Sequence, residues 1–123
     1  MSHAPTDPEL AILKCLWAAA PRSARSIHEE AGAALGWSLS STRTTVARMV
    51  GKGLLVETKR DGVRVYAPAE AKTKTVAGLL RRFFGRVLEM DGPLPVAAFT
   101  GSGLLSEDEI AEVEALLADG DEA

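Results

Sequence analysis

The stretch WSLSSTRTTVARMVGKG, residues 37–53, continued by LLVETKRDGVRVYAP, residues 54–68, decides the fold of this 123-residue chain. Its first part has the pattern of a helix, because Ser38 or Ser40 can accept a hydrogen bond from a free N–H group at the helix start. Gly53 can adopt the left-handed conformation that ends many helices. We therefore predict a helix that runs to Lys52.

The second part of this stretch predicts a β-hairpin. Two runs rich in β-branched and aliphatic residues, 54–59 and 63–67, flank Asp61-Gly62, a dipeptide that suits a type I′ turn. A helix that leads directly into a hairpin is the second half of a winged helix-turn-helix. In that fold the helix enters the major groove of DNA.

The two sides of the predicted helix differ in chemistry. At about 100° per residue, the side that must be buried carries Leu39, Thr42, Val46, Met49 and Val50. The opposite side has hydroxyls and cations but no carboxylate, and consists of Ser40, Ser41, Thr44, Arg48, Gly51 and Lys52. Hydroxyl groups can hydrogen-bond to phosphates and base edges, and Arg and Lys neutralise phosphate charge. This side is therefore a candidate DNA-contacting face.

Positive charge gathers in the same part of the chain. Lys59, Arg60 and Arg64 lie near the predicted hairpin tip, and residues 37–66 hold six Lys and Arg against two acidic residues, a net charge of +4. The whole chain has a formal net charge of −3, so this asymmetry is local and favours a polyanionic partner over a merely solvated face. The alternative is a winged helix that binds a protein through its acidic tail, but such a module need not keep this face free of acid.

The residues before this stretch supply two further helices. Thr6 and Glu9 have the spacing of a capping box, and Asp7 offers a second way to cap the same helix, which should run to about Ala20. Another helix is expected over residues 23–35. Its residues available for burial are Ala24, Ile27, Ala31 and Leu35.

Composition changes after Pro68. Residues 1–70 carry a net charge of +2 and residues 71–123 one of −5, so we expect the two parts to do different tasks. Amphipathic segments at 73–90 and 106–117 predict helices, and a short apolar segment at 94–99 can form another. The apolar positions are Val76, Leu79, Leu80, Phe83, Phe84, Val87, Leu88, Ile110, Val113, Leu116 and Leu117.

Two or three short helices bury too little surface to offset the loss of chain entropy. These apolar positions must therefore pack either on the winged-helix body or on a second copy of the chain. We predict a mainly α-helical protein with a small β-hairpin wing. It combines a winged helix-turn-helix DNA-binding domain at residues 1–70 with a helical dimerisation region at residues 71–123.

Other functional classes find no support in the sequence. Runs of three carboxylates within four residues occur only after residue 105, where a helix start and the acidic tail explain them, and Gly101-Ser102-Gly103 lacks the context of a nucleophile elbow or a phosphate-binding loop, so we predict no catalytic site. Cys15 is the single cysteine and should be a small apolar side chain, and we expect neither a disulfide, a metal site nor a cofactor. The chain has no apolar run of membrane-spanning length and no signal peptide, which predicts a cytoplasmic protein.

Four motifs resemble those of the penicillinase and methicillin-resistance repressors, the BlaI/MecI family. E-x-x-I/V-L/M-x-x-L-W stands at residues 9–17, and W-S-x-x-T/S-x-x-T-x-x-x-R-L/M-x-x-K-G stands at residues 37–53. The basic hairpin ends in V-Y-x-P at 65–68, and L-S-x-D/E-E-I follows at 105–110. Each motif alone is weak, but the four together cover nearly the whole chain in family order.

The resemblance implies a repressor that occupies a palindromic operator as a homodimer joined by its carboxy-terminal helices. Of the positions that contact DNA in such repressors, Ser40 stands where better-studied members have Lys, which suggests a different operator or a smaller salt dependence. Arg43 lies near the buried edge of the helix but can extend to a phosphate. The full set of candidate DNA-contacting residues is Ser40, Ser41, Arg43, Thr44, Arg48, Lys52, Lys59, Arg60 and Arg64.

The resemblance also implies a way of releasing DNA. In such repressors a membrane sensor-protease, activated by a β-lactam, leads to a cut in the dimerisation region. Counting back from the motif at 105–110 places the matching bond at Ala98-Phe99, where this chain has Ala in place of the usual Asn. Residues 96–99 also suit the core of a dimer, so the releasing signal, β-lactam or other, stays open.

Overall fold

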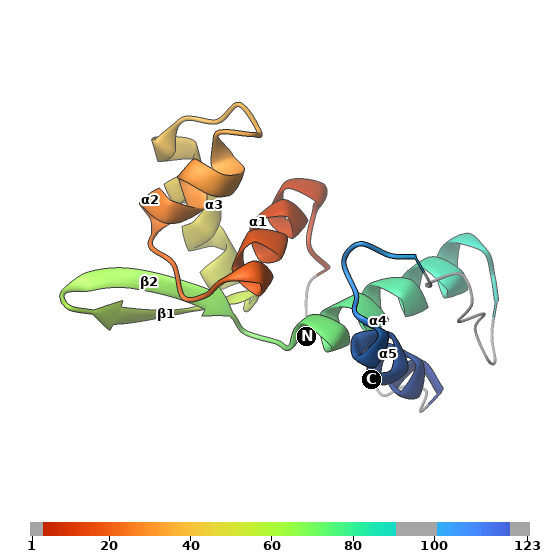
Figure 1. The fold of residues 1–123 in the computed structure, drawn as a ribbon. Helices are drawn as coiled ribbons and strands as arrows, with labels where there is room; N and C mark the ends of the chain where they lie inside the picture. Colours follow the sequence, from red (N-terminus) through yellow and green to blue (C-terminus); the bar gives the residue numbers. More distant parts are fainter. Residues whose placement is uncertain (1–3, 91–100, 119–123) are drawn as a thin grey trace. The chain divides into compact units, whose positions relative to one another are not determined.

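Three helices and a β-hairpin form the first of two units in the computed structural model, which describes residues 4–90 and 101–118 (Figure 1). This unit, residues 1–70, contains α1 (Asp7–Ala18), α2 (Ala24–Ile27), the π-helical turn η1 (His28–Gly32), α3 (Leu39–Gly51), β1 (Leu55–Arg60) and β2 (Val63–Pro68). The second unit, residues 71–123, contains α4 (Lys72–Arg82), the π-helical turn η2 (Phe83–Val87) and α5 (Glu107–Ala118). The predicted fold class, mainly helical with a two-stranded antiparallel hairpin, is confirmed.

Helix α1 begins with the capping box. The Thr6 N–H donates to Glu9 Oε1 at 2.9 Å, and the Glu9 N–H donates to Thr6 Oγ1 at 3.4 Å, so two of the free N–H groups at the helix start are satisfied. Asp7, the other predicted cap, is the first helical residue. The helix ends at Ala18, earlier than predicted, because the chain is already extended at Ala19 on its way to Pro21.

The second predicted helix is shorter than expected. Ser23 caps it by accepting a hydrogen bond from the Ser26 N–H at 3.1 Å, but regular α-helix ends at Ile27. In η1 the Ala33 N–H bonds to the His28 carbonyl at 2.7 Å, five residues back, which inserts an extra residue into the turn. The side chains after Gly32 therefore point in directions that differ from those of a regular α-helix, on which the prediction was based. The prediction that Leu35 is buried is wrong, since it is 37% exposed.

A close contact joins η1 to α3. Gly32 is buried, and His28 Nδ1 lies 2.9 Å from Oγ1 of Thr42, a residue of α3 that is completely buried. A Cβ on Gly32 would collide with Thr42 Oγ1 and would lie 2.6 Å from His28 Nδ1. Glycine is therefore required here for the two helical segments to approach each other.

Replacing Gly32 with Ala is expected to lower the free energy of unfolding of this unit by about 1–3 kcal/mol, the usual penalty for overpacking a core. Urea unfolding followed by tryptophan fluorescence measures the change, because both tryptophans, Trp17 and Trp37, belong to residues 1–70. Gly51→Ala is the matched control, since an added Cβ at Gly51 meets nothing within 4 Å. Equal stability of the Gly32 variant and the wild type would contradict the tight contact.

Helix α3 ends at Gly51, one residue before the predicted end at Lys52, and it buries the predicted inner side. Of the two predicted caps, Ser38 is the one used, accepting a hydrogen bond from the Ser41 N–H at 3.1 Å, and Gly53 follows the helix with a φ of 82°. The predicted inner side faces the core, with Leu39 and Val50 half-buried and with Thr42, Val46 and Met49 buried. These residues pack with apolar residues of the other elements, chiefly Ile12, Leu13, Leu16, Ile27, Leu55 and Tyr66.

The hairpin turns at Asp61 and Gly62, whose φ angles of 52° and 80° fit the predicted type I′ turn. Its strands are joined to the helices through the backbone. The Arg22 N–H donates to the Tyr66 carbonyl at 3.0 Å, and the Tyr66 N–H donates to the Arg22 carbonyl at 2.8 Å, so Arg22 extends the sheet by one bridge. This bridge holds the wing beside the helices.

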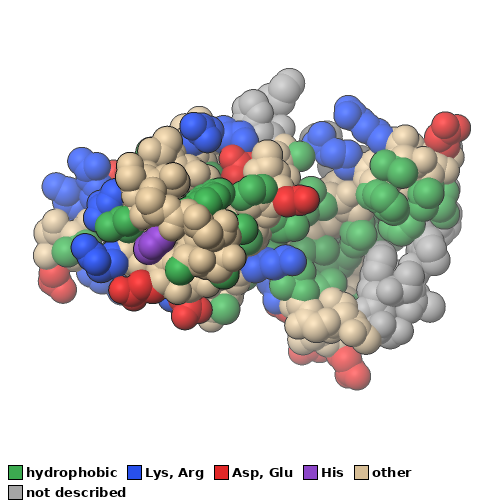
Figure 2. All heavy atoms as spheres, turned by 90° about the horizontal axis from the view of Figure 1, so that it is seen from above, with side chains coloured by type: hydrophobic (Ala, Val, Ile, Leu, Met, Phe, Trp, Pro, Cys, Tyr) green, Lys and Arg blue, Asp and Glu red, His purple; other side chains and the backbone are tan. Residues whose placement is uncertain are grey.

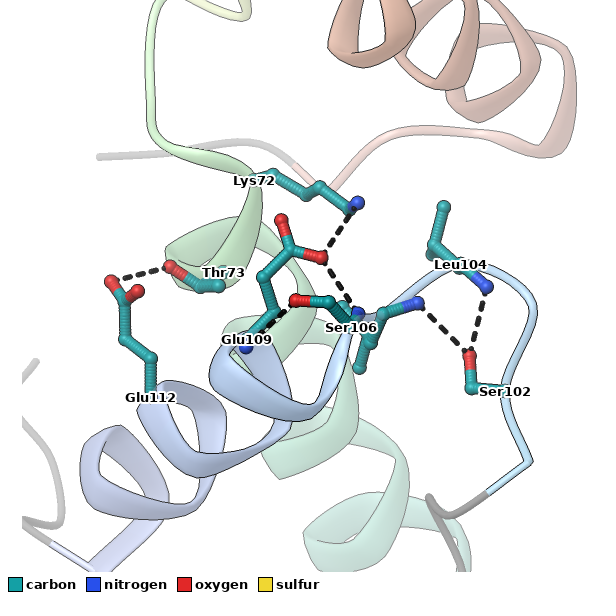
Figure 3. A network of polar contacts seen from close by, with 8 residues as sticks. Lys72, Thr73, Ser102, Leu104, Ser106, Glu109 and Glu112 are labelled. Carbon is teal, nitrogen blue, oxygen red and sulfur yellow. Dashed lines mark hydrogen bonds and ion pairs between the residues drawn. The ribbon is translucent and has the colours of Figure 1, made fainter.

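In the second unit, α4 and α5 pack against each other around Ala77 and Val113. Polar contacts at their edges add to this packing (Figure 3): Lys72 Nζ lies 3.0 Å from Glu109 Oε1, and the Thr73 hydroxyl donates to Glu112 Oε2 at 2.7 Å. Ser106 and Glu109 form the predicted capping box of α5 (Figure 3), with distances of 2.9 and 3.2 Å. The helix predicted at 73–90 is α-helical only to Arg82, and the turn η2 follows it. The predicted helix at 94–99 and the Ala98-Phe99 bond lie outside the described residues.

Candidate nucleic-acid interface

The outer side of α3 presents hydroxyls and a guanidinium to solvent. The exposed residues are Ser40, Ser41, Thr44 and Arg48. The Ser38 hydroxyl donates to the Ser41 hydroxyl at 3.2 Å, which orients the Ser41 side chain at the helix start. Arg43 is also exposed, and its positive charge acts to lower the pKa of the Tyr66 phenol in β2. The face can therefore offer donors, acceptors and positive charge to a polyanion.

Lys52 is the one residue of the predicted set that the structure turns inward. Its ammonium group donates to both carboxylate oxygens of Glu9, at 2.9 and 2.8 Å, and Glu9 itself is only 4% exposed. The helical wheel could not find this partner, because Glu9 lies in α1, 43 residues away in sequence. With its charge engaged by a buried carboxylate, Lys52 does not belong with the exposed cations of α3.

The wing carries the second group of cations. Lys59 and Arg64 stand directly opposite each other in the hairpin, and Arg60 is next to the turn; all three are exposed. Figure 2 shows Lys and Arg side chains gathered around the hairpin end of this unit. Two like charges at a directly opposed position destabilise a hairpin, and the Glu57 carboxylate, 3.7 Å from Arg64 Nε on an exposed surface, offsets little of this. A bound anion would relieve the repulsion.

Tyr66 connects the wing to the helices. Burial raises the pKa of its phenol, and the neighbouring Glu57 raises it further. Tyr66 therefore stays neutral and fills a place in the core, while its backbone pairs with Arg22. The sequence did not single out Arg22, since no local pattern indicates a one-residue bridge to a strand more than 40 positions away.

The chain matches the penicillinase repressor family over residues 5–119. It belongs to that family. The resemblance inferred from the four motifs is thereby confirmed. This is a family of repressors rather than of enzymes, in agreement with the absence of a catalytic motif from the sequence.

Two curated relatives of this penicillinase repressor family member come from Mycobacterium tuberculosis. Each is named transcriptional regulator BlaI, one from strain CDC 1551 / Oshkosh and one from strain ATCC 25618 / H37Rv. Each is 29% identical over 75 residues, which is 60% of this chain and 54% of the relative. The chain thus spans about half the length of the curated relatives that it matches.

The residues predicted to form the dimer interface fall into three groups by burial in this family member. Val113 is fully buried between α4 and α5 of one chain, so it belongs to the core of this unit. Most of the others are half-buried, namely Val76, Leu79, Leu80, Phe84, Ile110, Leu116 and Leu117, and all of these except Leu79 pack against the cluster of Ala77 and Val113. Phe83 and Val87 remain open to solvent, at 48% and 63% exposure.

The exposed group continues toward the end of the described part of this unit. Leu88 and Met90 are 48% and 38% exposed, and hydrophobic side chains form a group on the surface of the second unit in Figure 2. We call Phe83, Val87, Leu88 and Met90 the apolar patch. Exposed apolar side chains that gather on one surface are a common feature of sites of protein–protein contact, so the apolar patch is a candidate for such a site.

Other candidate chemistry is weak in the part of the chain that the structure describes. Burial raises the pKa of the Cys15 thiol, which makes the reactive thiolate scarcer. No group of three or more His, Cys, Asp and Glu within residues 4–90 and 101–118 could hold a metal ion. Over the same ranges, no helix has both the length and the apolar character needed to cross a bilayer.

Proposed function

We propose that this chain is a transcriptional repressor that binds operator DNA with the outer side of α3 and with the wing. The observation that carries the proposal is the pairing of an acid-free exposed helix face with opposed cations, Lys59 and Arg64, on the adjacent hairpin. Helix α3 would lie in the major groove, and the wing cations would bind the phosphate backbone beside it. A DNA-binding repressor of this kind acts in the cytoplasm.

The contacts would divide into two kinds. Ser41 and Thr44 are short and exposed on the first two turns of α3, where a hydroxyl can reach base edges. The charged side chains, namely Arg43, Arg48, Lys59, Arg60 and Arg64, would neutralise phosphates. Ser40, near the helix start, would bond to the backbone through its hydroxyl.

We propose further that two copies bind together on a palindromic operator. The apolar patch supports a homodimer, because exposed phenylalanine, valine, leucine and methionine side chains lose water-exposed surface when a second copy covers them. An isologous dimer presents two α3 helices related by a two-fold axis, which matches a palindrome of two half-sites.

Release from the operator would follow an upstream signal. A cut at Ala98-Phe99 by a membrane sensor-protease system, linked to β-lactams, is one candidate. Such a cut would break the covalent link between α4 and α5. The contacts between these helices, including the ion pair of Lys72 with Glu109, would then be all that holds α5 in place. Fragment masses from cells exposed to a β-lactam test this route, and release of target genes with the chain intact would exclude it.

Selection of bound fragments from a genomic DNA library tests the function as a whole. We expect recovery of a few promoters that share a palindrome. Winged helices also serve as protein-binding modules, and the acidic α5 would be the docking surface in that case. No retention of any duplex at low salt would favour that second reading.

Arg48→Ala is expected to weaken operator binding and to reduce the slope of log affinity against log salt by about one, because one phosphate contact is lost. If the wing binds the phosphate backbone of DNA, Lys59→Ala and Arg64→Ala should also weaken binding and reduce this slope. Fluorescence anisotropy across a salt series measures the slopes. Arg82→Ala, which removes an exposed cation from α4, is the control and should leave the slope unchanged. An unchanged slope for Arg48→Ala would remove this residue from the interface.

A further inference from the structure

The Glu9–Lys52 pair is a buried contact rather than a surface one. Glu9 is 4% exposed, and the Lys52 side chain is 25% exposed. The two carboxylate oxygens lie 2.9 and 2.8 Å from the same Nζ, which is the geometry of strong charge-assisted hydrogen bonds. Exposed lysines pair with several partners in turn, whereas this one is held by one partner.

Both ends of the pair are fixed in their own elements. The Glu9 carboxylate also accepts the Thr6 N–H at 2.9 Å, so it closes the first turn of α1. The Lys52 N–H donates to the Arg48 carbonyl at 2.9 Å and ends α3, and the Leu54 N–H bonds back to Met49 at 2.9 Å before β1 begins. The pair therefore ties the start of α1 to the place where the proposed recognition helix ends and the wing begins.

The charges of the pair suit the helix ends that they occupy. A carboxylate in the first turn of α1 and an ammonium group at the end of α3 each interact favourably with the helix dipole. Burial by itself raises the pKa of Glu9, but hydrogen bonds from Lys52 and from Thr6 outweigh it and hold the pKa below its ordinary value. Glu9 is thus ionised at neutral pH, and the pair is charged on both sides.

We propose that Lys52 is a positioning residue for DNA binding, which acts through Glu9 to set the orientation of α3 on α1 and does not itself bind phosphate. Moving the end of α3 would displace Arg48, one turn earlier, and with it Thr44 and Ser41 on the same face. The inference rests on the proposed function and deepens it, since it assigns to Lys52 a part in operator discrimination rather than in charge neutralisation.

The variant Glu9→Gln separates the two roles, because it leaves the lysine charge in place and removes its anchor. If Lys52 positions α3, Glu9→Gln is expected to weaken binding to the operator about tenfold. If Lys52 instead binds phosphate, releasing it from Glu9 would leave affinity unchanged or raise it. Glu9→Gln/Lys52→Met, which keeps the net charge of the wild type, should bind the operator as weakly as Glu9→Gln alone. Lys52→Arg, which can bond to both carboxylate oxygens, should retain operator affinity.

The full chain and its variants are titrated into a duplex recovered by genomic selection and into a non-operator duplex, across a salt series. Each variant is measured below its own unfolding transition, as followed by tryptophan fluorescence. The expected result is a loss of affinity for the operator alone, with the same salt slope in Glu9→Gln and in the double variant. A merely structural pair would lower the unfolding temperature and leave the affinity of the folded variants unchanged.

Three outcomes overturn the inference while the wild-type chain still binds DNA. These are unchanged or tighter operator binding by Glu9→Gln, a slope that falls by about one when Lys52→Met is added to it, and equal losses on both duplexes. Failure of the wild-type chain to bind either duplex would overturn the proposed function, and the inference with it. The two failures are therefore distinguishable.

Discussion

Phe83→Asp is expected to turn the proposed homodimer into a monomer and to lower affinity for a palindromic operator by roughly 100-fold or more. Phe83 belongs to the apolar patch and is 48% exposed, so the single chain tolerates a charge there. In a dimer the same aspartate would be buried without a partner, which is strongly unfavourable. The loss on DNA is large because two linked half-site contacts bind far more tightly than one.

Sedimentation velocity and operator titration measure the two effects of Phe83→Asp together. Lys74→Asp is the matched control, since it places the same carboxylate at an exposed position of α4 outside the apolar patch. The control should stay dimeric. A Phe83→Asp variant that sediments as a dimer would show that the interface lies on another surface.

Val113→Asp is expected to have a different and equally large effect, namely loss of the packing between α4 and α5. Val113 is completely buried, and among the described residues of this unit Ala77 is the other buried apolar side chain. Burying a carboxylate there without a partner destabilises the unit by about 3 kcal/mol or more. So small a core has little stability to lose, so the two helices should separate.

Circular dichroism and tryptophan fluorescence distinguish this result from simple loss of a dimer. Val113→Asp should reduce helix content, whereas the urea transition reported by Trp17 and Trp37 in the first unit should be retained. Phe83→Asp should keep its helix content. Unchanged helix content in Val113→Asp would mean that Val113 is not in a core of the chain's own helices.

Much of the first unit could be predicted because its signals are local. The capping box at Thr6, the cap at Ser38 and the Asp61-Gly62 turn each depend on residues within a few positions, and the structure places each as predicted. The inner side of α3 also follows from periodicity, since Thr42, Val46 and Met49 are the residues that become buried. The family was indicated by the resemblance of four motifs to those of known repressors, and the family match over residues 5–119 confirms it.

The extent of a helix and the surface on which it packs depended on contacts between residues distant in sequence, and these could not be predicted. The second helix does not reach Leu35, because η1 inserts a residue beside the contact of Gly32 with Thr42. The pattern also marks Val113 for burial, and the structure buries it against α4 in the single chain, while its part in a dimer stays a prediction. In both cases the helical wheel gave a correct local pattern and no information about the surface on which the helix would pack.

The sequence by itself determined the kinds of elements, the acid-free face of α3 and the basic hairpin, because capping, turn chemistry and periodicity act over a few residues. Only the tertiary structure decided the state of the side chains that find partners across the fold. Lys52 carries the same charge as Arg48 and follows it by one helical turn, yet it is withdrawn from solvent by Glu9, 43 residues earlier. Arg22 likewise gains its role through a backbone bridge to Tyr66. A charged side chain or a backbone group pairs with whichever partner folding brings within hydrogen-bond distance. The spacing of residues along the chain does not predict that partner.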